Sequence, residues 1–284
     1  MNKILVIGGT GTVGSQVVSQ LVEQGVSVRV LTRNPDSAHS PSQVELIPGD
    51  LSAPDSLDAG LQDIGAVFLV WAAPPAAAIP ALERITRKAS RIVFLSAPLK
   101  TPHPLFQQPN LARNLGLQIE QLIESSGTPW TFLRPGMFAA NSKEWWAPQI
   151  REGDVVRWPH LDVPTAPIDE RDIAAVAVRA LTESGHDKAE YVITGPQSLT
   201  HYEQISTIGK ILGRSLQIEE LSPEEARRDL LPVFPRPVVN MLLDAWAAAA
   251  GQPAFVSSTF QQLMGRPPRP FSEWATYNAP HFRT

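Results

Sequence analysis

The chain has 284 residues, of which 43% are hydrophobic and 18% are charged, so it can bury a sizeable core and is not a disordered chain. Its 24 Lys and Arg against 28 Asp and Glu give a net charge of −4 without any basic block, which disfavours nucleic-acid binding. The absence of cysteine excludes disulfides, thiolate metal sites and thiol chemistry, and it is consistent with a reducing compartment.

No segment predicts a membrane span or an export signal. The uncharged apolar stretch 66–82 is shorter than the roughly 20 residues of a bilayer-crossing helix and is interrupted by prolines. The first apolar segment, 4–7, is shorter than the apolar core of about 7 to 15 residues in a signal peptide. We therefore expect a soluble, cytoplasmic protein with no membrane partner.

Short apolar runs alternate with amphipathic helical stretches through the first half of the chain. The predicted strands are residues 3–7, 26–31, 44–47, 66–70, 91–95 and 130–133. Their apolar residues do not alternate strictly with polar ones, which indicates strands covered on both faces. Because neighbouring parallel strands need a right-handed crossover, the pattern predicts a doubly wound parallel α/β sheet.

A glycine-rich turn follows the first predicted strand directly and opens the first predicted helix. Glycines at positions Gly8, Gly11 and Gly14 allow a tight turn, close approach of the backbone to a pyrophosphate and close packing of helix on strand. The competing phosphate-loop alignment lacks the lysine that must precede Ser15. The turn therefore predicts a dinucleotide site rather than nucleotide hydrolysis, with a merely tight strand–helix turn as the alternative.

The end of the second predicted strand bears on which dinucleotide is bound. A cofactor with a free ribose 2′-hydroxyl favours an acidic residue here, but the chain has Arg33. Because a guanidinium binds phosphate through paired hydrogen bonds, Arg33 favours NADP(H) over NAD(H). The alternative is that Arg33 is a solvated loop charge, paired with Asp36.

From about Gly136 the pattern becomes irregular, with scattered prolines and many tryptophans. A strand-like run follows at 191–194, with helices near 202–212 and 223–230. We predict an NADP-binding Rossmann-type domain at residues 1–135 and a smaller, interleaved substrate-side region at 136–284. A part of that region, about residues 165–195, is expected to return to the sheet.

These motifs and several later ones resemble the atypical short-chain dehydrogenase/reductases, and most closely their NmrA-like, NAD(P)H-binding branch. Besides the glycine turn, the segments that carry the resemblance are 32–35, 49–51, 126–136, 167–175 and 271–282. The resemblance covers nearly the whole chain. It implies a Rossmann-type fold and either a reductase or a redox sensor.

The glycine motif and the resemblance together predict a cofactor site along the ends of the strands. The resemblance implies that Asp50 and Leu51 lie at the adenine, the residues after the fourth strand at the ribose, and Ser96 and Pro135 near the nicotinamide. Two alternatives are that Asp50 caps a turn and that Ser96 satisfies a strand-end backbone group. The full predicted set is Gly8, Thr10, Gly11, Thr12, Val13, Gly14, Thr32, Arg33, Asn34, Asp50, Leu51, Trp71, Ala72, Ala73, Ser96 and Pro135.

The proton donor of the wider superfamily is absent from the sequence. In that superfamily a Tyr-x-x-x-Lys pair protonates the alkoxide formed by hydride transfer. None of the three tyrosines of this chain is followed by lysine at that spacing: Tyr191, Tyr202 and Tyr277. Many NmrA-like reductases have Lys or His four residues before the glutamate matched here by Glu120, where this chain has Gly116. No catalytic residue is therefore assigned, and the nearest polar candidates are Ser96, Lys100 and His103.

Aromatic and apolar residues crowd the predicted substrate side: Phe106, Met137, Phe138, Trp145, Trp146 and Trp158. Ligand pockets are mostly apolar, so this group predicts a small apolar substrate that is aromatic or polycyclic, with ordinary core packing as the alternative.

We thus expect an NADPH-dependent reductase that passes hydride to a carbonyl, quinone or conjugated double bond. The alternatives are a non-catalytic NADP(H)-binding redox sensor and a non-redox isomerase or cyclase on the same fold. The histidines show no pair at metal-binding helical spacing and no serine-esterase elbow occurs, so no metal site is expected.

Overall fold

The computed structural model describes residues 3–38, 40–108 and 111–283. The chain divides into two compact units, and each is built from three segments. Unit 1 contains Met1–Ala97, Ala112–Pro135 and Glu170–Val192, and unit 2 contains Pro98–Leu111, Gly136–Asp169 and Ile193–Thr284. Among the described helices, none has both the length and the apolar composition that a bilayer crossing requires.

Unit 1 is built around a seven-stranded sheet with the strand order β3-β2-β1-β4-β5-β6-β9. Every pair from β3 to β6 is parallel. This order and direction confirm the predicted doubly wound sheet. The strands are β1 (Lys3–Ile7), β2 (Val28–Thr32), β3 (Glu45–Pro48), β4 (Ile64–Val70), β5 (Arg91–Leu95), β6 (Trp130–Pro135) and β9 (Ala189–Ile193).

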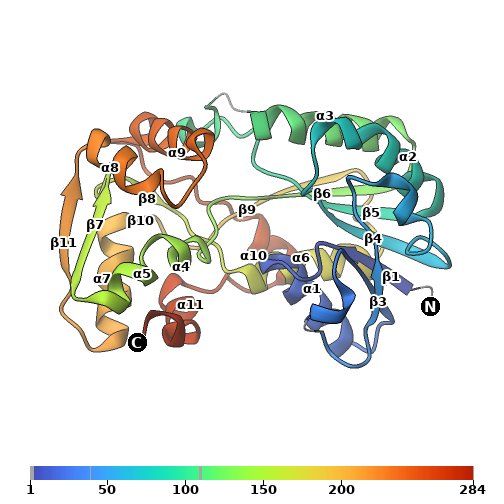
Figure 1. Ribbon diagram of the computed structural model, residues 1–284, viewed down its shortest axis with the longest axis horizontal. Coiled ribbons are helices and arrows are strands. Elements are labelled where there is room, and N and C mark those ends of the chain that lie inside the picture. The colour runs from blue at the N-terminus through green and yellow to red at the C-terminus, as the bar shows by residue number, and fades with distance from the viewer. Residues whose placement is uncertain (1–2, 39, 109–110, 284) are drawn as a thin grey trace. The chain divides into compact units, whose positions relative to one another are not determined.

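Helices cover both faces of this sheet (Figure 1). On one face, apolar residues of α2 (Ala78–Lys88) and α3 (Leu111–Ser125) pack with strand residues such as Leu5, Val67 and Phe94 in one buried cluster. On the other face, α1 (Thr12–Glu23) and α6 (Glu170–Thr182) pack against each other and against the central strands. Because both faces of the central strands are buried, β1, β2, β4, β5 and β6 consist mainly of apolar residues, as the sequence predicts. Short 3-10 turns join several of these elements: η1 (Pro35–Ser37), η2 (Pro54–Leu57) and η3 (Pro75–Ala77).

Unit 2 contains two small sheets and a set of helices. A parallel pair joins β7 (Val155–Pro159) to β11 (Gln217–Leu221), and an antiparallel pair joins β8 (Pro164–Thr165) to β10 (Leu199–Thr200). The helices are α4 (Asn141–Trp145), α5 (Ala147–Glu152), α7 (His201–Leu212), α8 (Pro223–Leu230), α9 (Arg236–Ala249), α10 (Thr259–Met264) and α11 (Phe271–Tyr277), with 3-10 turns η4 (Pro104–Phe106) and η5 (Ala279–Phe282). Capping boxes begin both α7 and α8, where the sequence also predicts helices.

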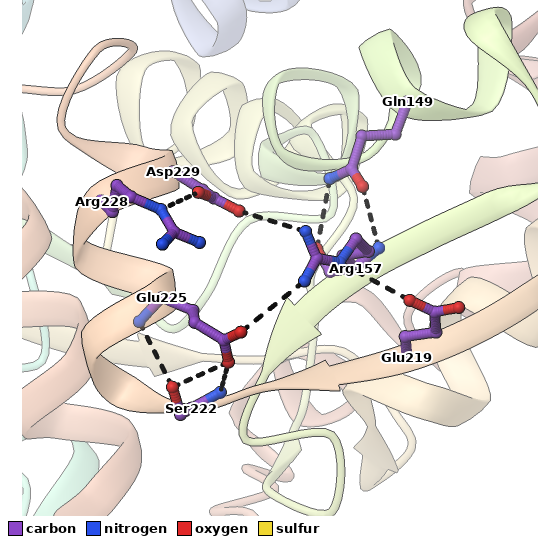
Figure 2. A network of polar contacts seen from close by, with 7 residues as sticks. All are labelled: Gln149, Arg157, Glu219, Ser222, Glu225, Arg228 and Asp229. Carbon is purple, nitrogen blue, oxygen red and sulfur yellow. Dashed lines mark hydrogen bonds and ion pairs between the residues drawn. The ribbon is translucent and has the colours of Figure 1, made fainter.

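An arginine-centred network lies where β7, β11 and α8 meet (Figure 2). The Arg157 guanidinium lies 3.6 Å from the Glu219 carboxylate, 3.9 Å from that of Glu225 and 3.7 Å from that of Asp229. The Arg157 backbone N–H donates to Gln149 Oε1 at 2.8 Å. Because the guanidinium is 43% exposed and its ion pairs are long, each contributes little stability by itself. The network therefore connects β7, β11 and α8 without being a main source of the unit's stability.

The core of unit 2 is an aromatic cluster around one buried histidine. Rings of Trp146, Trp158 and Trp246, each at most 1% exposed, lie with their centroids 5.0 to 6.5 Å from the His201 imidazole. His201 Nδ1 lies 2.9 Å from the His160 carbonyl oxygen, and donates to it in the neutral tautomer. Burial lowers the pKa of His201 from 6.5 to about 4, so the imidazole is neutral near pH 7.

This buried histidine predicts an acid-sensitive core. Unfolding returns the pKa of His201 to 6.5. Between pH 6.5 and about 4, His201 is therefore protonated in the unfolded chain and neutral in the folded chain. Over this window His201 lowers the free energy of unfolding by about 1.4 kcal/mol per pH unit, to a total of about 3 kcal/mol. Urea unfolding at pH 7, 6 and 5 should therefore show a shallower loss of stability for His201→Phe than for the parent chain. The exposed His281 supplies the control, since His281→Phe should keep the parental pH dependence; parallel curves for the parent and His201→Phe would contradict this origin of the acid sensitivity.

Candidate functional site

A cavity of about 560 Å³ lies at the carboxyl ends of the strands of unit 1. Its walls come from the turns after β1 and β3, the loop after β2 and the end of β4. β1 stands between β2 and β4, which is the switch point where open parallel α/β sheets bind their ligands. The lining residues are Ile7, Gly8, Thr10, Gly11, Leu31, Thr32, Arg33, Asn34, Ser37, Ala38, Gly49, Asp50, Leu51, Val70 and Ala72.

The turn after β1 forms a cradle that only glycine permits at two positions. Gly8 has φ of +88°, in the left-handed region, and a Cβ on Gly14 would lie 2.0 Å from the Gly8 carbonyl oxygen. α1 therefore approaches the end of β1 closely. Its N-cap, Gly11, has no side chain to occupy the N–H groups of the first turn, and it lines the cavity. A pyrophosphate fits this cradle, since unpaired N–H groups and the positive end of the helix dipole attract it.

The loop after β2 gives the cavity a polar rim. Arg33, Asn34 and Ser37 are exposed, and all three line the cavity. In the described part of the chain Arg33 forms no ion pair with Asp36, the partner considered in the alternative interpretation of this arginine. The Arg33 guanidinium is therefore available to a ligand.

Asp50 lines the cavity and also caps a turn. Its Oδ1 accepts hydrogen bonds from the Ser52 backbone N–H at 2.8 Å and from the Ser52 hydroxyl at 2.6 Å. These bonds, and to a smaller extent the Arg33 charge, lower the pKa of the Asp50 carboxyl. Asp50 thus fulfils the alternative prediction of a turn cap while it faces the cavity as a carboxylate.

Two family models match the chain, one described as NAD(P)H-binding over residues 8–184 and one as NmrA-like over residues 114–274. A (4-alkanoyl-5-oxo-2,5-dihydrofuran-3-yl)methyl phosphate reductase of Streptomyces griseus is 38% identical, with 98% of this chain and 99% of the relative covered. An NAD(P)H azoreductase of Xenophilus azovorans is 33% identical, again with 98% and 99% covered.

The chain belongs to the NmrA-like family. The expected class, an NAD(P)H-dependent oxidoreductase of the atypical short-chain dehydrogenase/reductase type, is confirmed by these matches. The solved triphenylmethane reductase of Citrobacter sp., complexed with NADP(H), has a TM-score of 0.80 at 19% identity, with 97% of this chain and 99% of that chain covered. That likeness shows the fold of this NmrA-like chain.

The cavity brings together most of the cofactor residues predicted from the sequence. Those that line it are Gly8, Thr10, Gly11, Thr32, Arg33, Asn34, Asp50, Leu51 and Ala72. The others lie beside it or farther along the sheet edge: Thr12, Val13 and Gly14 in α1, Trp71 and Ala73 after β4, Ser96 after β5 and Pro135 at the end of β6. The Trp71 indole N–H donates to the Ala73 carbonyl oxygen at 2.7 Å, which closes the turn after β4. Cofactor contact by the full set stays a prediction.

Six lining residues were not predicted from the sequence: Ile7, Leu31, Ser37, Ala38, Gly49 and Val70. Three of them are strand-end hydrophobic residues, whose pattern indicates only burial. Ser37 and Ala38 reach the cavity because η1 turns the chain back after Arg33. The proline that begins η1 was the available signal for this turn.

The predicted substrate residues separate into two groups within unit 2. Trp145, Trp146 and Trp158 are 9%, 0% and 1% exposed and lie in the aromatic core, where Trp145 stacks on Trp158 and Trp146 meets both rings edge-on. Phe106, Met137 and Phe138 are only partly buried and pack at the edge of that core. Substrate contact stays a prediction for all six.

The polar candidates for proton transfer also have defined partners. His103 Nδ1 accepts from the Leu105 backbone N–H at 3.3 Å, and Nε2 lies 3.0 Å from the Pro253 carbonyl oxygen. This imidazole therefore caps η4 and ties two loops of unit 2 together. The Ser96 hydroxyl donates to Glu120 Oε1 at 2.7 Å. Across the described ranges, no group of three or more His, Asp or Glu side chains is arranged to hold a metal ion.

The contact between Gly14 and Gly8 predicts a sharp difference between two glycine substitutions in one turn. Gly14→Ala forces the new methyl into the Gly8 carbonyl, so it should lower the free energy of unfolding by about 1 to 3 kcal/mol and weaken NAD(P)H binding. Gly11→Ala is the matched control for stability, because its Cβ would meet the same carbonyl at 3.4 Å, an ordinary contact. Thermal unfolding of both variants tests this difference, and coenzyme titration of Gly14→Ala measures the loss of binding. Equal behaviour of the two would show that the close approach is not what restricts position 14.

Proposed function

We propose that this chain is an NADPH-dependent reductase that transfers hydride to a carbonyl, quinone or conjugated double bond of a small apolar or aromatic substrate. The observation that carries the NADPH preference is Arg33, exposed at the cavity rim with no ion pair to Asp36. A guanidinium in this position matches the geometry and charge of a ribose 2′-phosphate. Its hydrogen bonds to the phosphate replace the water that the guanidinium loses when the coenzyme binds.

Asp50 supports the same orientation of the coenzyme. Its carboxylate is held ionised by Ser52 and offers its remaining oxygen to a hydrogen-bond donor. The exocyclic amino group of adenine is such a donor. A second anion at that end of the cavity would be repelled by Asp50, so Arg33 on the rim is the better position for the 2′-phosphate.

When bound, the reduced nicotinamide supplies the hydride. The chain's tyrosines do not offer the usual acid, because the Tyr191 hydroxyl is bonded to His186 Nδ1 at 2.8 Å and burial raises the pKa of Tyr191. Tyr202 and Tyr277 are 53% and 63% exposed on the surface of unit 2. We therefore infer that the reduced substrate takes its proton from water or from a nearby polar group.

The substrate class is supported by relatives and by unit 2. Two relatives that are at least 30% identical act, by their names, on a dihydrofuranone phosphate and on azo compounds, both of which are conjugated. Phe106, Met137 and Phe138 are partly exposed apolar side chains of the kind that line pockets for flat, conjugated molecules. We assign them, rather than the fully buried tryptophans, as the first residues to test for substrate contact.

Removal of the Arg33 guanidinium should change coenzyme preference. Arg33→Ala loses the charge-assisted bonds to the 2′-phosphate, which are about 1.5 to 3 kcal/mol, so the Kd for NADPH should rise roughly 10- to 100-fold while that for NADH changes little. Fluorescence titration with both coenzymes measures this difference. Arg87→Ala is the control, since Arg87 is an exposed arginine of the same unit that pairs with Glu83 on α2. A loss of equal size for NADPH and NADH would contradict the 2′-phosphate assignment.

Turnover separates the reductase from its two alternatives. The purified chain with NADPH should oxidise the coenzyme in the presence of at least one member of a panel of quinones, aryl ketones, enones and azo dyes. Tight NADPH binding without oxidation by any acceptor would instead support a redox sensor. Conversion of a substrate without net consumption of NADPH would support an isomerase or cyclase.

A further inference from the structure

Ser96 follows β5 at the same edge of the sheet as the cavity. In the parallel pair of β4 and β5, Val70 lies opposite Leu95, so the next residue, Ser96, stands level with Trp71. Val70 and Ala72, on either side of Trp71, both line the cavity. Adjacent strands are about 4.8 Å apart, which makes Ser96 the next position along the edge from the cavity wall.

The Ser96 hydroxyl proton is committed to a buried carboxylate. Ser96 Oγ lies 2.7 Å from Glu120 Oε1, and the Glu120 residue is 2% exposed. The same Oε1 accepts from Arg134 Nε at 2.9 Å, while Oε2 accepts from Arg134 Nη2 at 2.6 Å. A carboxylate in a bidentate pair with a guanidinium is an acceptor only, so the hydrogen between Ser96 and Glu120 belongs to the serine.

Arg134 is itself fixed from its other side. Its Nη1 and Nη2 donate to the two carboxylate oxygens of Glu190 on β9 at 2.5 and 2.8 Å. The two paired carboxylates raise the pKa of the Arg134 guanidinium against the opposing effect of its burial. Three elements, α3, β6 and β9, therefore hold the acceptor of the Ser96 proton in one orientation.

A serine hydroxyl that donates its only proton has only lone pairs left for other partners. Building on the proposed function, we propose that Glu120 is a positioning residue that turns Ser96 into a hydrogen-bond acceptor for the carboxamide N–H of the nicotinamide. Ser96 is then not the missing acid. Its oxygen orients the nicotinamide ring, and Glu120 fixes that oxygen.

Coenzyme analogues distinguish an acceptor from a merely structural serine. The reduced 3-acetylpyridine analogue of NADPH carries a methyl ketone in place of the carboxamide and so has no N–H to donate. Ser96→Ala should raise the Kd for NADPH about 5- to 10-fold, the effect of one neutral hydrogen bond, and leave the Kd for the analogue nearly unchanged. Ser96→Thr retains the hydroxyl and should restore the parental preference between the two coenzymes.

The role of Glu120 is tested by the ratio of the Kd for the 3-acetylpyridine analogue to the Kd for NADPH. Glu120→Gln can present its amide N–H to Ser96 and release the serine proton, so its ratio should move toward that of Ser96→Ala. Glu190→Gln is the matched variant: it also removes one carboxylate charge from Arg134, but Glu190 does not contact Ser96, and its ratio should stay parental. Thermal unfolding of both variants records the loss of the ion pair itself.

The binding measurements distinguish failure of the acceptor role of Ser96 from failure of the proposed function. Equal weakening of both coenzymes by Ser96→Ala, or equal ratios for Glu120→Gln and Glu190→Gln, would overturn the acceptor role. Failure of the parent chain to bind NADPH would instead overturn the proposed function. Because these are binding measurements, a lack of turnover leaves them interpretable.

Discussion

The close contact of Gly14 with the Gly8 carbonyl is the constraint on which the coenzyme site depends. It places the first turn of α1 directly against the end of β1, so that the helix dipole and its unpaired N–H groups meet the cavity. Val13 and Val17, both buried on α1, keep the helix in that position through the apolar face of the sheet. Under the proposed function, this turn holds the coenzyme pyrophosphate and Arg33 on the rim contacts the 2′-phosphate.

Two arginines at this sheet edge, Arg33 and Arg134, differ in burial and in their partners. Arg33 is exposed and available to a ligand, whereas Arg134 is 2% exposed and held by two carboxylates. A lone buried guanidinium would be costly, and the pairing with Glu120 and Glu190 offsets its desolvation. The buried arginine therefore orients its two carboxylates, and under the proposed function the exposed one binds the coenzyme.

The sheet could be predicted from the sequence because its central strands are mainly apolar and the helices between them are amphipathic. The strands at Lys3–Ile7 and Arg91–Leu95 agree with prediction to the residue, and α8 does as well. Unit 2 was harder, since β8 and β10 have only two residues each, β7 and β11 contain charged residues, and α9 follows a proline-rich loop without a side-chain cap. The glycine cradle and Arg33 were predictable because local spacing determines them. The Ser96–Glu120–Arg134 network was not, because its members are 14 to 38 positions apart and only the fold brings them together.

The Ser96 hydroxyl donates its proton to Glu120, so under the proposed function it does not protonate the reduced substrate. A reductase without a positioned acid must leave a product anion that water can protonate. An alkoxide from an isolated ketone is a strong base, and its formation is unfavourable without a donor nearby. Reduction of a quinone or an enone gives a phenolate or an enolate, in which conjugation spreads the charge and lowers the basicity. Among the three acceptor types considered, the polar groups of this chain therefore favour quinones and conjugated double bonds over simple carbonyl compounds.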